Sequence, residues 1–134
     1  MGQPAAKQGD QVIAVDTHIV MVPSPPGSPI PTPLPHPFSG KLDGALSSDV
    51  KMEGKAAATV DSTASNSPAH VPTPPGTAFQ TSPANKGTVS MGSQTVKING
   101  KPAARMGDTV ETCNDPTDAP VGSIVVPSST VLIG

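Results

Sequence analysis

The chain has 134 residues, and eight lysines and arginines against ten aspartates and glutamates give it a net charge of −2. It has no basic cluster that could neutralise a row of phosphates, which argues against nucleic-acid binding. No stretch approaches the roughly 18 apolar residues of a membrane helix. Residues 1–7 lack the apolar core of a signal peptide, so we expect synthesis in the cytoplasm without one.

Strand signals are short, and helical periodicity is nearly absent. In chain order, strands are predicted at residues 11–15, 88–91, 93–98, 123–126 and 130–133. Asn99-Gly100 is a good turn signal between residues 96–98 and residues 101–103. Two proline-rich stretches, 23–37 and 68–83, are expected to form extended polyproline-like loops. The sequence therefore predicts one all-β domain over residues 1–134.

The chain is a degenerate triple repeat. Residues 4–12 match residues 102–110 at six identical positions, and residues 50–58 resemble residues 96–104. Chaining the two alignments places Asp10, Ser62 and Asp108 in register, in repeat units of about 1–30, 48–80 and 86–134. A unit of this size cannot bury an apolar face alone, so three units are expected to pack into a three-sided object.

The metal-ligand candidates follow the repeat. We call Asp10, Ser62 and Asp108 the anchor residues of the three units. His18 and His70 each lie eight residues after the anchor of their unit, and Cys113 lies five residues after the third anchor. His36 belongs to the proline-rich loop after the first unit. Three imidazoles and a thiolate match a closed zinc site, which is structural because no coordination position is free. An ion would staple a core that contains only two aromatic residues, Phe38 and Phe79.

Several alternatives accompany this prediction. A single histidine can be a polar loop residue, and Cys113 can be a small buried hydrophobe. An enzyme with Cys113 as nucleophile and a histidine as base is conceivable, but the chain has no oxyanion motif or phosphate loop. A disordered proline-rich linker that binds metal loosely is a third interpretation. Five acidic residues are scattered and are expected to be solvated loop carboxylates: Asp16, Asp43, Glu53, Asp108 and Glu111.

The repeated segments resemble a known family. Residues 102–105 read Pro-Ala-Ala-Arg, the signature of PAAR-repeat proteins, and residues 4–7 read Pro-Ala-Ala-Lys. Gly-Asp follows both copies, at 9–10 and 107–108. The resemblance covers nearly the whole chain, although the middle copy, residues 56–59, reads Ala-Ala-Ala-Thr and lacks the proline and the basic residue.

The resemblance implies a non-enzymatic spike-tip protein of contractile injection machines: type VI secretion systems, phage tails and extracellular injection systems. It implies a small pseudo-threefold cone of short β-hairpins with long proline-rich loops and a metal near the apex. The base would cap a trimeric spike of the VgrG or phage-like type, one tip per trimer. The tip would aid membrane puncture, could carry an effector, and would leave the bacterial cytoplasm on the apparatus. The metal would be zinc, with iron as the alternative, held by His18, His36, His70 and Cys113.

Overall fold

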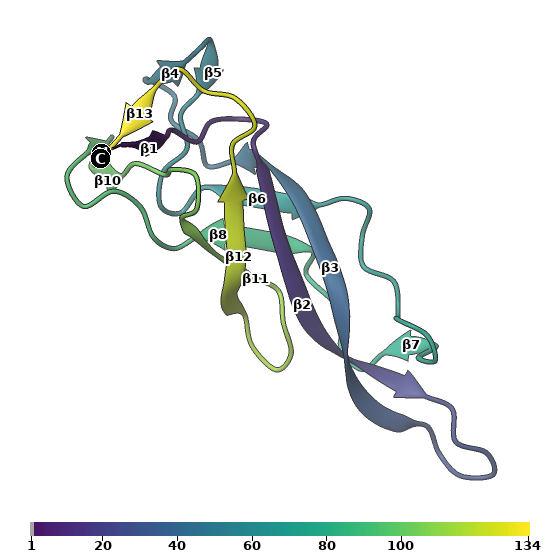
Figure 1. Ribbon diagram of the computed structural model, residues 1–134. Coiled ribbons are helices and arrows are strands. Elements are labelled where there is room, and N and C mark those ends of the chain that lie inside the picture. The colour runs from purple at the N-terminus through teal and green to yellow at the C-terminus, as the bar shows by residue number, and fades with distance from the viewer. Residues whose placement is uncertain (1) are drawn as a thin grey trace.

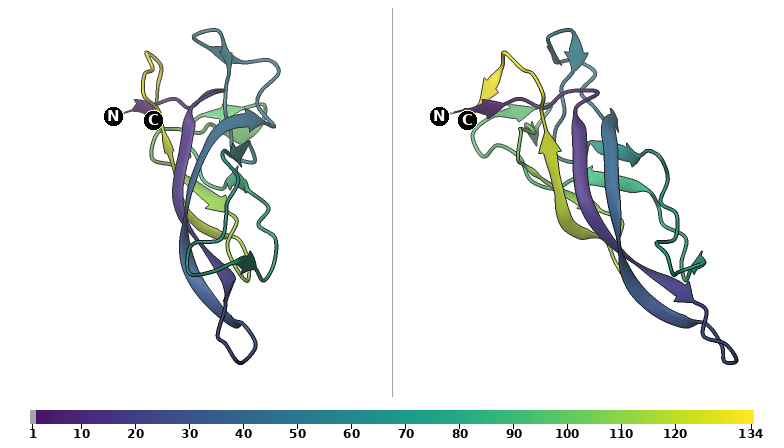
Figure 2. Two further views of the ribbon diagram at one scale, coloured as in Figure 1. Left: turned by 90° about the vertical axis from the view of Figure 1, so that its right-hand side faces the viewer. Right: turned by 45° about the vertical axis from the view of Figure 1, so that its right-hand side comes forward.

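The computed structural model describes residues 2–134, and every regular element in that range is a β-strand. The predicted all-β fold is confirmed. Within the same range there is no helix that could cross a membrane. The molecule tapers from a wide end, where β1 and β13 lie, to a narrow end formed by the projecting β2–β3 hairpin (Figures 1 and 2).

Six strands close into a barrel. The order around it is β12–β11–β8–β6–β3–β2, and β12 pairs back with β2. The barrel consists of three antiparallel hairpins, β2–β3, β6–β8 and β11–β12, each paired with the next. The short β7 (Ala78–Phe79) joins the other edge of β2. The barrel strands are β2 (Gln11–Val22), β3 (Ile30–Gly44), β6 (Thr63–Asn66), β8 (Lys86–Val89), β11 (Thr109–Thr112) and β12 (Ala119–Val125).

Three short ribbons form the wide end, and we call them the base ribbons. They pair β1 with β13, β4 with β5 and β9 with β10. In two of them the turn has two residues with positive φ, as a tight hairpin requires, and the turn predicted at Asn99-Gly100 is one of these. The third ribbon joins the two ends of the chain. The strands are β1 (Gln3–Pro4), β4 (Lys51–Met52), β5 (Lys55–Ala56), β9 (Lys97–Ile98), β10 (Lys101–Pro102) and β13 (Leu132–Ile133).

A closed ring of main-chain hydrogen bonds marks the pseudo-threefold axis. The N–H of Ala6 donates to the carbonyl of Ala104 at 3.0 Å, that of Ala104 to Ala58 at 3.0 Å, and that of Ala58 to Ala6 at 3.1 Å. All three alanines are fully buried. We call these residues the alanine ring. Only small side chains allow three backbones to meet in this way around one axis.

Each repeat has two successive alanines, at residues 5–6, 57–58 and 103–104. The two members of a pair lie in different apolar clusters, because successive side chains of an extended chain point to opposite sides. The second alanine of each repeat packs in the barrel with Phe38, Leu42 and Ile124. The first packs at the wide end with three residues at equivalent positions of the base ribbons: Met52, Ile98 and Ile133. The repeated Ala-Ala dipeptide therefore contributes one residue to each cluster.

The anchor residues of the repeat form the same side-chain to main-chain hydrogen bond in all three units. Each side chain accepts a hydrogen bond from the main-chain N–H three residues earlier, at 2.9 Å for Asp10, 3.0 Å for Ser62 and 2.7 Å for Asp108. The middle unit keeps this turn although Asp61, with φ of 78°, stands where the other units have glycine. Asp108 is buried and also bound by a guanidinium, so the expectation of a solvated carboxylate was wrong there.

The first proline-rich stretch differs from the expected loop, because β3 already begins at Ile30. Four prolines alternate along β3 and point outward: Pro31, Pro33, Pro35 and Pro37. The β2 residues opposite them turn their polar groups away from β3; for example, the carbonyl of Ile19 accepts from Gln80 N–H at 2.9 Å. The missing proline N–H groups therefore cost no bond between the two strands. The second stretch, 68–83, has no regular element except β7.

Candidate metal centre

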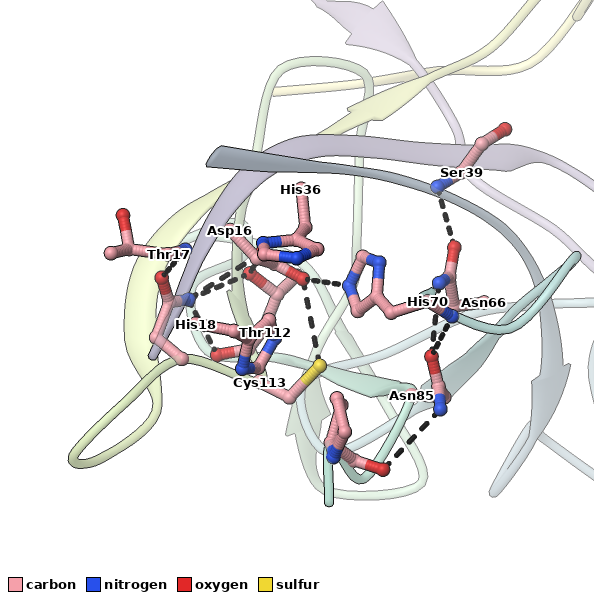
Figure 3. A network of polar contacts seen from close by, with 12 residues as sticks. Asp16, Thr17, His18, His36, Ser39, Asn66, His70, Asn85, Thr112 and Cys113 are labelled. Carbon is pink, nitrogen blue, oxygen red and sulfur yellow. Dashed lines mark hydrogen bonds and ion pairs between the residues drawn. The ribbon is translucent and has the colours of Figure 1, made fainter. Parts of the chain in front are cut away.

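The candidate site lies where the barrel gives way to the projecting hairpin. Asp16 and His18 alternate along β2 and face inward, and His36 faces inward from β3 opposite Asp16. His70 comes from the connection between β6 and β8, and Cys113 from the connection between β11 and β12. Each of the three barrel hairpins thus contributes to one cluster of polar side chains (Figure 3).

The structure brings the three predicted histidines together. The ring centroids are 5.0 Å apart for His18 and His70, 5.4 Å for His18 and His36, and 5.6 Å for His36 and His70. His36 was expected in a loop, but it is a strand residue, and its position on the inner face follows from the alternation along β3. That these residues bind a metal together remains a prediction.

The closest group of donor atoms differs from the predicted set by one residue. One donor atom each from Asp16, His18, His70 and Cys113 lie within 4.8 Å of one another, so this group could hold a metal ion. The expectation that Asp16 is a solvated loop carboxylate was wrong, because the residue is fully buried. The signal that could have found it is its spacing: residues two apart on a strand face the same side, and His18 was already a candidate.

The hydrogen-bonding state of His18 fits a bound ion. This residue is 1% exposed, yet neither ring nitrogen has a hydrogen-bond partner. Its Nδ1 lies 3.4 Å from a carboxylate oxygen of Asp115 without forming a hydrogen bond to it, and its Nε2 has no hydrogen-bond partner either. Buried polar atoms without partners are costly. A metal bound at His18 would supply the partner.

The environment of Cys113 does not favour a nucleophile. The thiol is buried, and burial raises its pKa above the ordinary value of 9.0. A reactive cysteine needs the opposite shift, so the enzyme alternative finds no support in this thiol. A metal ion would favour the thiolate directly.

The closed barrel contradicts the interpretation of the chain as a disordered linker. The disordered proline-rich linker fails because the strands pair into a closed barrel that encloses a common core.

The site is flanked by two hollows. A cavity of about 390 Å³ borders His36 and His70 and is otherwise lined mainly by the proline-rich segment 66–74. A second, of about 290 Å³, borders His18 and Cys113. The cluster therefore has a hollow beside it on either side.

Comparison with known proteins agrees with the geometry. The family model described as "PAAR motif" matches residues 79–134. This segment contains the third repeat, with its Pro-Ala-Ala-Arg and Gly-Asp turn, and Cys113. No match was found among curated proteins or among solved structures. A PAAR motif supports a structural role associated with the spike of contractile injection systems. The resemblance drawn from the repeats is thereby confirmed over residues 79–134, which carry a PAAR motif.

Proposed function

We propose that this protein is the tip that caps and sharpens the trimeric central spike of a contractile injection machine. The observation that carries the proposal is the alanine ring, together with the three base ribbons that surround the same axis. A single chain with threefold-related elements at its wide end can offer similar contacts to three identical subunits. The opposite end narrows to one hairpin (Figure 2), which suits a pointed, mechanically passive role.

The proposal includes one structural zinc ion, with iron as the alternative. His18, His70 and Cys113 belong both to the set predicted from the sequence and to the group of close donor atoms. His36 belongs only to the first set and Asp16 only to the second. Imidazole and thiolate ligands favour zinc over calcium or magnesium. When bound, the ion would cross-link the three hairpins on the side of the barrel opposite the base ribbons.

The cellular role follows from the same proposal. The protein is made in the bacterial cytoplasm, is mounted on the spike of a type VI, phage-tail-like or extracellular injection system, and is driven outward when the sheath contracts. It aids puncture of the target membrane. The exposed proline-rich segments are available to attach an effector. A stiff barrel, with three hairpins joined at both ends, suits this mechanical role better than it suits catalysis.

The decisive experiment is assembly with the cognate spike. The purified tip and spike trimer are mixed, and the mass of the complex is measured by light scattering and native mass spectrometry. We expect one tip per three spike chains. Leu132→Asp, on a base ribbon and 63% exposed, should abolish the complex, whereas Val15→Asp, on the barrel flank and 62% exposed, should not. If no complex forms although both wild-type partners are folded, the proposal fails.

A further inference from the structure

We propose that the alternating prolines of β3 close the free edge of the projecting β2–β3 hairpin to strand addition, so that a second copy of this chain cannot pair with it. We call residues 30–37 of β3 the proline edge. The inference concerns the backbone of the hairpin (Figures 1 and 2) and needs neither a metal nor a spike. It therefore goes beyond the proposed function and holds or fails independently of it.

The proline edge has no neighbouring strand on one side. β3 pairs with β2 from Ile30 to Lys41, but it pairs with β6 only over residues 40–44. Among residues 2–134, no strand lies against the other side of residues 30–39. An unpaired edge normally presents main-chain N–H and carbonyl groups that can template another strand. The question is therefore which groups this edge presents.

Hydrogen bonds near the barrel show which residues of β3 point to that edge. The N–H of Ser39 donates to Oδ1 of Asn66 at 2.9 Å, and its carbonyl accepts from the N–H of Ser67 at 2.9 Å, so its polar groups face away from β2. The N–H of Leu42 donates instead to the carbonyl of Asp10, on the β2 side, at 2.9 Å. Main-chain groups alternate in direction along an antiparallel strand. The residues that point to the unpaired edge are therefore all prolines: Pro31, Pro33, Pro35 and Pro37.

The proline edge consequently offers acceptors and no N–H donors. A strand added there could make only the bonds that it donates itself, and the pyrrolidine rings occupy the positions of the missing hydrogens. One of the acceptors is already used, because the carbonyl of Pro35 accepts from the hydroxyl of Thr73 at 2.7 Å. The part of the edge most open to a second copy lies farther out, at Pro31 and Pro33, and both residues are exposed.

The opposite edge of the hairpin, on β2, is covered by other segments of the chain. The N–H of Thr17 donates to Oδ1 of Asn114 at 2.6 Å, and its carbonyl accepts from the N–H of Asp115 at 2.8 Å. The N–H of Ile19 donates to Oδ2 of Asp115 at 2.9 Å, and its carbonyl accepts from Gln80 at 2.9 Å. Farther out, β7 pairs with β2. One edge is thus covered by protein, and the other depends on its prolines.

The hairpin has no charge that could take over this protection. Residues 17–40 contain no lysine, arginine, aspartate or glutamate, although charged side chains commonly protect exposed edges. The side chain of Ile30, at the outer end of β3, is 53% exposed. A long, uncharged edge with exposed apolar side chains favours association between copies. The missing N–H groups are therefore what keeps the hairpin single.

The test restores the missing donors with Pro31→Thr/Pro33→Thr in the full-length chain. Threonine favours strands, and each substitution adds an N–H at the exposed edge. In a symmetric pair of copies the two substitutions add four hydrogen bonds, each of which raises the association constant about fivefold. By sedimentation velocity, we expect the variant to dimerise at concentrations at least about 100-fold below those of the wild type. Hydrogen exchange of the dimer should show the new amides at residues 31 and 33 to be protected.

Pro23→Thr/Pro127→Thr is the matched control, because both prolines are exposed and lie outside the strands. It should behave as the wild type does. The proposal is overturned by a folded Pro31→Thr/Pro33→Thr variant that remains monomeric, by association without protection at residues 31 and 33, or by equal association of the control. Wild-type dimers that pair through residues 30–37 would also overturn it.

The single variants Pro31→Thr and Pro33→Thr guard against misfolding of the double variant. Each should raise the association constant by at least about tenfold, since each adds two hydrogen bonds to a symmetric pair. Both should fold, because an N–H at either position points to solvent and disturbs no bond to β2. Failure of both single variants to fold would contradict that placement and overturn the proposal.

Discussion

Replacing Phe38 by alanine tests whether the barrel interior is the main core. Phe38 is 2% exposed, is among the largest fully buried side chains, and lies with its ring 6.2 Å from that of His70. Truncating such a residue costs about 3–5 kcal/mol, because transfer free energy is lost and a cavity remains. For 134 residues the entropy of unfolding is about 0.28 kcal/mol per kelvin. The melting temperature should therefore fall by about 11–18 °C.

The assay is thermal and urea unfolding in the presence of a chelator, so that metal binding does not contribute to the free energy of unfolding. Phe79→Ala is the matched control. The residue is half-buried on β7, and its ring approaches those of His18 and His36 rather than the barrel cluster. We expect it to cost less than about half as much as Phe38→Ala. Equal losses, or a loss below about 1 kcal/mol for Phe38→Ala, would refute this account of the core.

Three further predictions concern pH, backbone crowding and metal removal. Burial lowers the pKa of His36 below 6.5 and raises the pKa of Cys113 above 9.0 in the folded, metal-free protein. As the pH falls, the histidine therefore takes up its proton in the unfolded state before it does so in the folded state. As the pH rises, the cysteine loses its proton in the unfolded state first. Stability measured by urea unfolding should thus decline below pH 6.5 and above pH 9.0, by up to about 1.4 kcal/mol per pH unit for each group; His36→Gln should flatten only the acid side. Gly40→Ala should destabilise the barrel strongly, because the new Cβ would lie 2.5 Å from the carbonyl oxygen of Ser65, whereas Gly27→Ala, with its nearest atom at 3.4 Å, should be nearly neutral in the same assay. Zinc at a thousandfold excess over its dissociation constant should add about 4 kcal/mol to the free energy of unfolding, and a chelator should remove this amount. After chelation, hydrogen exchange should still find the amides of the alanine ring protected. Loss of that protection would show that the wide end of the molecule depends on the metal.

The repeated segments of the sequence were sufficient to predict three equivalent units packed around one axis. The Pro-Ala-Ala and Gly-Asp segments recur because the same turn, the same small side chains and the same anchor bond are built three times around one axis. These interactions are local or link equivalent residues of the three repeats. The register of Asp10, Ser62 and Asp108 therefore follows from sequence similarity alone, and the middle repeat can lack the proline and still form the turn.

The sequence by itself thus determined the all-β class, the threefold repeat and a set of residues that includes His18, His70 and Cys113. Only the tertiary structure decided that the alternating prolines belong to a strand, because this depends on which edge of β3 the neighbouring strand occupies. It also decided that Asp16 is buried among the metal-ligand candidates and that His36 has its hydrogen bonds satisfied. The physical reason is the same in each case. The surroundings of a side chain at this site are set by three hairpins distant in sequence, whereas a local pattern such as the two-residue spacing of Asp16 and His18 indicates only which face of the strand a residue occupies.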